Sequence, residues 1–172
     1  NKVNIEFLGG GLFKKKPITV DVAFPIVHGT NCEDGTLQGY LEALGLPYVG
    51  CDVMSSALGM DKVLFKNVLN DNEIPVLPGV YFSSREWALQ KNETIKKIEN
   101  KLKYPLIVKP SNLGSSIGIS KVADQSELIT AVDLACTFAG NILIEHAVEN
   151  LREINCSVLG DRSDCKPSTL EE

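Results

Sequence analysis

Hydrophobic residues in the first part of the chain follow a pattern that predicts one strand and then one helix. Residues 20–27 form a mostly apolar run, which is typical of a buried parallel strand. An amphipathic helix that ends at Gly45 is predicted next, after a polar loop. Strand, loop and helix make half of a doubly wound α/β unit, whose ligands bind beyond the carboxyl ends of strands, where His28 and Glu33 lie. The apolar positions of this helix recur at i, i+3, i+4 and i+7: Leu37, Tyr40, Leu41 and Leu44.

After residue 50 the pattern changes to that of a compact α+β unit, in which strands are flanked by helices. The expected elements are a helix over 60–70, a strand over 76–82, a long helix that begins after Ser83 or Ser84 and reaches Leu102, a helix from Asp124 or Ser126 to Gly140, a strand over 141–145 and a last strand over 153–159. We therefore divide the chain into part of an N-terminal α/β domain (1–50), a central subdomain (51–149) and the opening of a third unit (150–172).

The stretch 105–121, PLIVKPSNLGSSIGISK, predicts two strands joined by a tight polar loop. Lys109 lies at the mouth of this loop, and Gly114 and Gly118 allow a positive φ and close backbone approach. Successive N–H groups in such a loop form an anion-binding concavity, and two serine hydroxyls add donors without bulk. The pattern favours a ligand that carries phosphate. A plain β-hairpin with a Gly/Ser turn is the alternative.

Composition and charge narrow the classes of function. The net charge of −5 at pH 7 argues against a nucleic-acid surface, and the only local basic run, at 14–16, reads as a solvated loop. No apolar run approaches the roughly 18 residues that span a bilayer. The five cysteines contain no C-x-x-C pair, so neither a zinc site nor a disulfide framework is indicated. A reducing, cytoplasmic setting fits this composition.

Five motifs in order give the chain a resemblance to a known family. HG…EDGTLQG, MDK, VKPSNLGSSIGISKV, ILIE and REINCSVLG, between about residue 20 and residue 172, resemble the D-alanine–D-alanine ligases, which are ATP-grasp enzymes. VGCDVMSSALGMDK and HGTNCEDGTLQG are most similar to the D-alanine–D-serine ligases of the vancomycin-resistance branch. The resemblance implies a partial ATP-grasp fold of the α/β and α+β class, and a chain that is a fragment of a longer protein.

The resemblance also implies a nucleotide site. Lys62 and Lys109 would contact ATP, and Ser115 and Ser116 would form the tip of the phosphate loop. Glu145 would face the adenine, and the backbone at Ala147 and Val148 would form the hinge beside the base. Glu153 would bind the ribose hydroxyls. Each of two residues could instead have no part in nucleotide binding. Lys62 could merely extend from its helix to solvent, and Glu153 could be an acidic residue of the surface.

The site of the first D-alanine is implied to include His28 and Glu33, with Ser115 facing the substrate. A histidine at the end of a strand is often a structural residue, so a purely structural His28 is the alternative. The resemblance implies Mg²⁺ as well as ATP, but no metal ligand within this chain. The magnesium carboxylates are expected beyond residue 172.

The implied reaction joins D-alanine to a second D-amino acid, D-serine or D-alanine, through an acyl phosphate formed from ATP. It would serve peptidoglycan precursor synthesis or glycopeptide resistance, and this chain alone is expected to be inactive. The expected partners are small-molecule substrates and a second copy of the protein in a homodimer, with no nucleic acid and no membrane. The alternatives are a non-catalytic nucleotide-binding module and a different ATP-grasp ligase.

Overall fold

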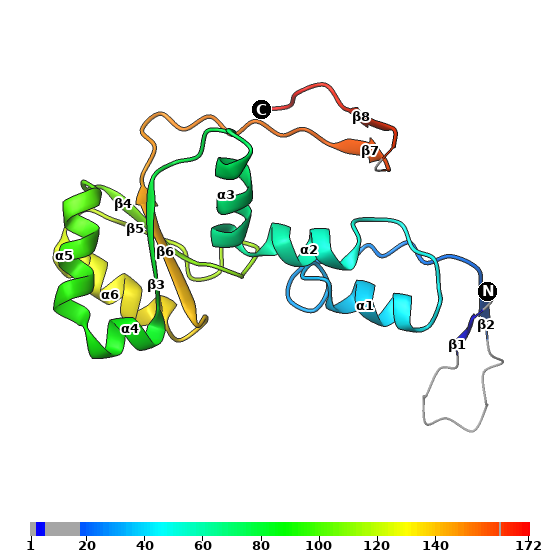
Figure 1. The fold of residues 1–172 in the computed structure, drawn as a ribbon, viewed down its shortest axis with the longest axis horizontal. Coiled ribbons are helices and arrows are strands. Elements are labelled where there is room, and N and C mark those ends of the chain that lie inside the picture. Colours follow the sequence, from blue (N-terminus) through cyan, green and yellow to red (C-terminus); the bar gives the residue numbers. More distant parts are fainter. Residues whose placement is uncertain (1–2, 6–17, 162) are drawn as a thin grey trace.

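The computed structural model describes residues 3–5, 18–161 and 163–172, so the lysine run at 14–16 lies outside the described residues. Figure 1 shows the elements in chain order. They are β1 (Val3–Ile5), β2 (Ile18–Val20), α1 (Thr36–Ala43), α2 (Val53–Met60), α3 (Lys62–Asp71), β3 (Gly79–Ser83), α4 (Ser84–Leu89), α5 (Lys91–Lys101), β4 (Leu106–Pro110), β5 (Ser120–Val122), α6 (Gln125–Ala135), β6 (Asn141–His146), β7 (Val158–Gly160) and β8 (Cys165–Pro167).

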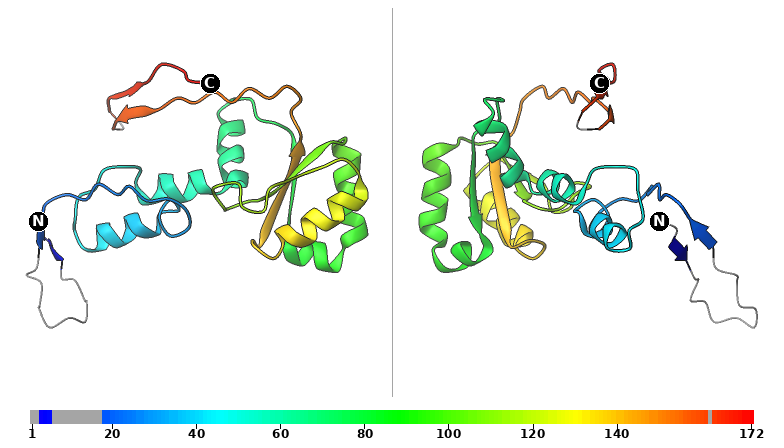
Figure 2. Two further views of the ribbon diagram at one scale, coloured as in Figure 1. Left: turned by 180° about the vertical axis from the view of Figure 1, so that it is seen from behind. Right: turned by 45° about the vertical axis from the view of Figure 1, so that its right-hand side comes forward.

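A four-stranded antiparallel sheet, in the order β3-β6-β4-β5, forms the centre of the chain. Helices α4, α5 and α6 cover one side of this sheet, whereas α3, α2 and α1 lie on the other side (Figures 1 and 2). After β6 the chain leaves the sheet as an extended segment that ends in the β7–β8 hairpin. The sheet therefore separates a helix-covered core from the side on which α3 lies.

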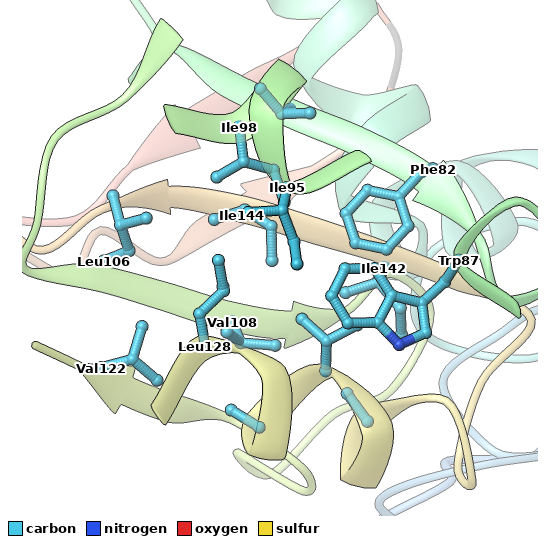
Figure 3. Packing of buried hydrophobic residues seen from close by; sticks show 14 of the residues in the cluster. Phe82, Trp87, Ile95, Ile98, Leu106, Val108, Val122, Leu128, Ile142 and Ile144 are labelled. Carbon is cyan, nitrogen blue, oxygen red and sulfur yellow. The ribbon is translucent and has the colours of Figure 1, made fainter. Parts of the chain in front are cut away.

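The hydrophobic core lies between the sheet and its three covering helices (Figure 3). Alternate residues of β4 point into it, as the burial of Leu106 and Val108 shows, and from β6 Ile142 and Ile144 are also fully buried. The ring of Trp87 stacks on Phe82, with 5.7 Å between the ring centroids. This packing fixes β4 and β6, whose ends carry Lys109 and Glu145.

Two predicted helix starts are confirmed, each by a side-chain cap. Ser83 accepts a hydrogen bond from the Glu86 N–H and caps α4, and Asp124 accepts from the Glu127 N–H and caps α6. The predicted long helix is wrong, because it divides at Gln90 into α4 and α5. The buried Thr94 donates from both its N–H and its hydroxyl to the Gln90 carbonyl, so Gln90 begins a second helix.

The predicted strand over 20–27 is also wrong. Only Ile18–Val20 is a strand, Ala23 forms an isolated bridge with Tyr48, and Phe24 is 70% exposed. A parallel strand needs neighbours on both sides, whereas among the described residues Val20 pairs with Val3 in the short β1–β2 sheet and residues 21–27 have only the bridge from Ala23 to Tyr48. The apolar run without a covering layer therefore stays irregular and exposed.

One further helix and two strand boundaries differ from the predicted ones. Helix α2 was not predicted, because its apolar sequence lacks a clear polar face. The Asp52 side chain caps α2 by accepting a hydrogen bond from the Ser55 N–H. The strand predicted over 76–82 begins only at Gly79, because Pro78 has no N–H to donate. The strand predicted over 153–159 is reduced to β7, whose residues are exposed and pair with β8.

Candidate functional site

The loop between β4 and β5 has the backbone of a tight, strained turn. Ser115 and Ser116 have φ values of 52° and 57°, and Gly118 has a φ of 71°. A Cβ atom on Gly118 would lie 2.8 Å from Cγ of Pro110, so this position needs glycine both for its φ and for its space. The predicted strand–loop–strand is confirmed, but the left-handed residues of the loop are the two serines and Gly118, not Gly114.

Lys62 fastens this loop to the first turn of α3. Its N–H donates to the Ser111 carbonyl at 2.8 Å, and its Nζ donates to the Leu113 carbonyl at 2.6 Å. Asp61 caps α3 by accepting from the Val63 N–H and so fixes the start of the helix. Burial, and then repulsion by Lys109, hold the pKa of Lys62 below its ordinary value. The ammonium group of Lys62 thus faces the loop rather than open solvent.

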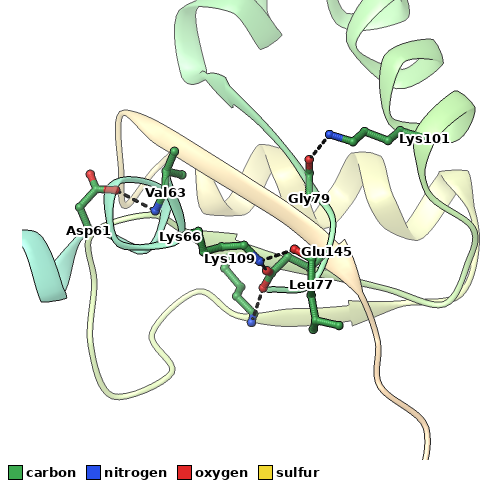
Figure 4. A network of polar contacts seen from close by, with 8 residues as sticks. All are labelled: Asp61, Val63, Lys66, Leu77, Gly79, Lys101, Lys109 and Glu145. Carbon is green, nitrogen blue, oxygen red and sulfur yellow. Dashed lines mark hydrogen bonds and ion pairs between the residues drawn. The ribbon is translucent and has the colours of Figure 1, made fainter. Parts of the chain in front are cut away.

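Glu145 lies between two lysines on the α3 side of the sheet (Figure 4). Its Oε2 accepts from Nζ of Lys109 at 2.7 Å, and its Oε1 accepts from Nζ of Lys66. The Glu145 side chain is only 6% exposed. Burial alone would raise the pKa of this carboxyl, but the hydrogen bonds and charges of Lys109 and Lys66 outweigh burial and lower it. Glu145 is therefore a buried carboxylate.

Two cavities meet at Lys62. The first, of about 370 Å³, is lined by His28, Glu33 and Ser115 together with Lys62. The second, of about 350 Å³, is lined by Lys109 and Glu145 together with Lys62. The fold thus brings the candidate substrate residues into one cavity and three candidate nucleotide residues into the adjoining one.

Within the first cavity, Glu33 is fixed by its own loop. Its Oε2 accepts from the Gly29 N–H at 2.6 Å, and its Oε1 lies 3.8 Å from Nδ1 of His28. The same carboxylate reaches the loop after β4, because a Cβ on Gly114 would lie 3.5 Å from Glu33 Oε2. His28 and Glu33 therefore line one cavity together with residues 113–115 of the loop after β4.

Four of the candidate residues line neither cavity. Ser116 lies at the loop tip, and Ala147 donates its N–H to the Pro105 carbonyl at 3.0 Å just after β6. Val148 and Glu153 are exposed on the segment that leaves the sheet. Ala147, Val148 and Glu153 follow Glu145 in the sequence, whereas Ser116 lies next to Ser115 in the loop after β4.

The structure adds two residues that the sequence reasoning missed. Lys66 contacts Glu145 and lines the second cavity; its spacing of four residues from Lys62 on one helix is the signal that could have identified it. Ser111 begins the loop, is 1% exposed, and its Oγ has no hydrogen-bond partner within the described part of the chain. No sequence signal distinguishes Ser111 from the other loop serines.

No group of three or more His, Cys, Asp or Glu side chains in 3–5, 18–161 and 163–172 is arranged to hold a metal ion. In the same residues, every helix is too short or too polar to cross a bilayer.

The antiparallel sheet, its three covering helices and the serine loop beside converging lysines define part of an ATP-grasp fold. The chain belongs to the D-alanine–D-alanine ligase family: residues 5–51 match the model described as D-ala D-ala ligase N-terminus, and residues 68–172 match the model described as D-ala D-ala ligase C-terminus. This confirms the resemblance seen in the five motifs.

Individual relatives agree with this assignment. The chain is 44% identical over 147 residues to the D-alanine–D-alanine ligase of Heliobacterium modesticaldum, covering 86% of this chain and 40% of the relative. Its structure is similar to the VanG D-Ala:D-Ser ligase of Enterococcus faecalis, with a TM-score of 0.80, 39% identity, and coverage of 90% of this chain and 43% of that one. The D-alanine–D-alanine ligase of Coxiella burnetii has a TM-score of 0.77 and 38% identity, over 87% of this chain and 43% of that chain. The chain thus spans about two-fifths of the length of these relatives.

Proposed function

We propose that the protein containing this chain is an ATP-dependent ligase that joins the carboxylate of D-alanine to the amine of a second D-amino acid. The observation that carries the proposal is the pair of cavities that share Lys62, one beside His28 and Glu33 and the other beside Glu145. A reaction between an amino acid and ATP needs two such adjoining sites. The names of the relatives, D-alanine–D-alanine ligase and D-Ala:D-Ser ligase, support the choice of substrates.

The chemical problem in this reaction is that an anion attacks an anion. Two unit charges 4 Å apart repel by about 4 kcal/mol at an effective dielectric constant near 20. In our proposal the ammonium groups of Lys62 and Lys109 offset this repulsion, and the N–H groups of the loop at Ser115 and Ser116 add fixed donors. The substrate carboxylate would attack the γ-phosphorus of ATP and release ADP to give an acyl phosphate, and the second amine would then displace phosphate and lose a proton to form the amide.

The remaining nucleotide contacts are proposed from the order of residues around Glu145. Its carboxylate would accept from the amino group of the adenine, with Ala147 and Val148 beside the base. Glu153 would accept from the ribose hydroxyls, since a carboxylate can accept from both at once. These residues follow one another along β6 and the segment after it, as a nucleotide extended along that edge requires.

The first D-alanine is proposed to bind between His28 and Ser115. Glu33 would position this site, because its carboxylate fastens the Gly29 N–H and lies beside the His28 ring. Ser115 reaches the same cavity from the phosphate loop. The substrate carboxylate would therefore lie next to the lysine that the two cavities share.

Magnesium fits the nucleotide but not the side chains in the described part of the chain. Bound Mg²⁺ would neutralise part of the triphosphate charge. The described residues offer no cluster of three or more metal-binding side chains, and we assign no step to them through Mg²⁺. We propose instead that Mg²⁺ accompanies ATP and that its protein ligands lie outside residues 1–172.

Further properties of the whole protein also belong to the proposal. We propose a domain boundary near Gly50, a cytoplasmic homodimer, and a role in peptidoglycan precursor synthesis or in glycopeptide resistance. The second substrate, D-alanine or D-serine, decides between these roles. The similarity to VanG supports D-serine, and the curated relatives support D-alanine.

The test is phosphate release from ATP and Mg²⁺ by the 172-residue chain and by a longer protein that contains it. D-alanine is offered alone and then together with D-serine. Turnover in the longer protein, with none in this chain, is the expected result, and the preferred second substrate identifies the branch. A longer protein with all family motifs that binds ATP but turns over no D-amino acid would leave the nucleotide-binding module as the function.

A further inference from the structure

We propose that Lys66 is a positioning residue that makes the nucleotide site select 6-amino purines over 6-oxo purines. It fixes one oxygen of the Glu145 carboxylate and leaves the other oxygen to accept from the amino group of an adenine. The inference rests on the proposed function, because it takes the second cavity as a nucleotide site. The inference is drawn from one arrangement: the buried Glu145 carboxylate lies between Lys66 of α3 and Lys109 of β4 (Figure 4).

Lys66 is anchored independently of any ligand. Its Nζ donates to the Leu77 carbonyl at 2.6 Å as well as to Glu145 Oε1, and its side chain is 19% exposed. Leu77 belongs to the segment that connects α3 to β3. Because a fixed carbonyl and a carboxylate both accept from this ammonium, Lys66 stays in place when the rest of the site changes.

Lys109 has no such second anchor among the hydrogen bonds of the described residues. Its Nζ donates to Glu145 Oε2 at 2.7 Å, and its side chain is 26% exposed. When Lys109 turns to a phosphate, Oε2 loses its donor. The N–H of a 6-amino group can replace that donor, whereas a 6-carbonyl would place an acceptor against an acceptor. The two lysines thus have different tasks on one carboxylate.

The charge balance explains why the second lysine is necessary. The charged groups that line this cavity are Lys62 and Lys66 from α3, Lys109 from β4 and Glu145 from β6. Once Lys109 contacts phosphate, Lys66 is the cation that still touches Glu145. Without Lys66, burial would raise the pKa of Glu145, and a protonated carboxyl could donate to a 6-carbonyl. Selection between amino and oxo purines would then be weakened.

The test compares dissociation constants for ATP and inosine 5′-triphosphate (ITP) by calorimetry between pH 6 and pH 8, in the full-length protein that carries this chain. Lys66→Met keeps the length of the aliphatic stem and removes the charge. Lys97→Met is the matched control, because Lys97 of α5 also pairs with a carboxylate, that of Glu86 on α4, on the other side of the sheet. Unchanged circular dichroism and thermal unfolding would show that each variant folds.

We expect the wild type to prefer ATP at every pH in this range. In Lys66→Met this preference should fall about tenfold or more, corresponding to one charge-assisted hydrogen bond, and the fall should be greatest at the lowest pH tested, because loss of Lys66 raises the pKa of Glu145 and low pH favours its protonated form. Lys97→Met should match the wild type, and Lys66→Arg should restore selection because it keeps the charge.

Two outcomes would overturn the inference, and they are distinguishable. A wild type that binds no purine triphosphate would remove the proposed function and this inference together. A wild type that binds ATP and rejects ITP, with Lys66→Met equal to Lys97→Met at pH 6, would leave the proposed function standing and refute the role of Lys66. Glu145→Gln should lose selection at all pH values, because its amide can donate as well as accept.

Discussion

The Nζ atom of Lys62 lies 2.6 Å from the Leu113 carbonyl oxygen, although the two residues are 51 positions apart in sequence. Through this bond and the Lys62 N–H to the Ser111 carbonyl, the first turn of α3 fastens the loop after β4. Lys62 also lines both cavities. The position of the loop and the positive charge between the two cavities therefore depend on the same side chain. We therefore expect the order of the loop and the binding of a ligand to be coupled at Lys62.

The first prediction concerns this coupling. Lys62→Met should weaken ATP binding about tenfold or more, because one charge-assisted contact is worth about 1.5–3 kcal/mol and tenfold corresponds to 1.4 kcal/mol. It should also increase proteolytic cleavage within 111–118, since the Leu113 carbonyl loses its donor. Calorimetry with ATP and limited proteolysis followed by mass spectrometry measure the two effects.

The matched control for Lys62 is Lys101→Met. Lys101 also donates its Nζ to a main-chain carbonyl, that of Gly79 at 2.9 Å, but on the edge of the sheet away from the loop. This variant should bind ATP as the wild type does. If Lys62→Met and Lys101→Met bind ATP equally and are cleaved equally, Lys62 has no part in holding the loop or the nucleotide.

The second prediction concerns stability and pH at Glu145. Because its folded-state pKa lies below the ordinary value of 4.5, the carboxylate stabilises the fold above that pH, and this contribution is lost as the pH falls through the folded-state pKa. Glu145→Gln should lower the free energy of unfolding by about 2 kcal/mol at pH 7, where two lysines lose their charged acceptor. Urea unfolding from pH 7 to pH 3.5 should show the two proteins converging below pH 4.5.

Glu149→Gln is the control for this pH dependence, because Glu149 is exposed just after the sheet. It should follow the wild type across the whole pH range. A constant difference between Glu145→Gln and the wild type from pH 7 to pH 3.5 would contradict the ion pairing of Glu145 as a source of stability.

Sequence reasoning succeeded where local chemistry and packing agree. The β4–loop–β5 unit, the cap at Asp124 and the buried strand ending near Glu145 were predicted because turn residues, a capping side chain and an apolar run each act within a few residues. The motifs around Lys62 and Lys109 also led to the family. These features need little information from distant parts of the chain.

The failures have physical causes that lie outside the local sequence. The run that contains Phe24 is apolar enough for a strand, but within the described residues it has no layer to cover it. The break at Gln90 depends on the buried Thr94 hydroxyl, and burial is a tertiary property. The pairing of Lys66 with Glu145 spans 79 positions, so only the folded arrangement of α3 and β6 reveals it.

The third prediction concerns the core that supports the site. Ile144 is fully buried in β6, between Val80 of β3 and Val108 of β4. Ile144→Ala should lower the free energy of unfolding by about 3 kcal/mol, since it removes buried methyl groups and leaves a cavity. Urea unfolding followed by the fluorescence of Trp87, the single tryptophan of the chain, measures the loss in the same core.

Tyr81→Ala is the comparison for this core substitution. Tyr81 lies on the edge strand β3 and is 56% exposed, so its loss should cost about 1 kcal/mol or less. Equal costs for Ile144→Ala and Tyr81→Ala would mean that the core does not lie between the sheet and its covering helices.

The last prediction uses two glycines of the same loop. In Gly118→Ala the new Cβ would meet Cγ of Pro110 at 2.8 Å and Cδ2 of Phe138 at 3.0 Å, at a φ of 71° that alanine rarely adopts. In Gly114→Ala the Cβ would meet only Glu33 Oε2 at 3.5 Å, an ordinary contact.

Both variants lose the same conformational freedom in the unfolded state, so the difference between their stabilities isolates strain in the folded loop. Gly118→Ala should be less stable than Gly114→Ala by about 1–2 kcal/mol and be cleaved faster at the loop, as urea unfolding and proteolysis would measure. Equal stability of the two variants would show that the loop does not need the left-handed backbone at Gly118.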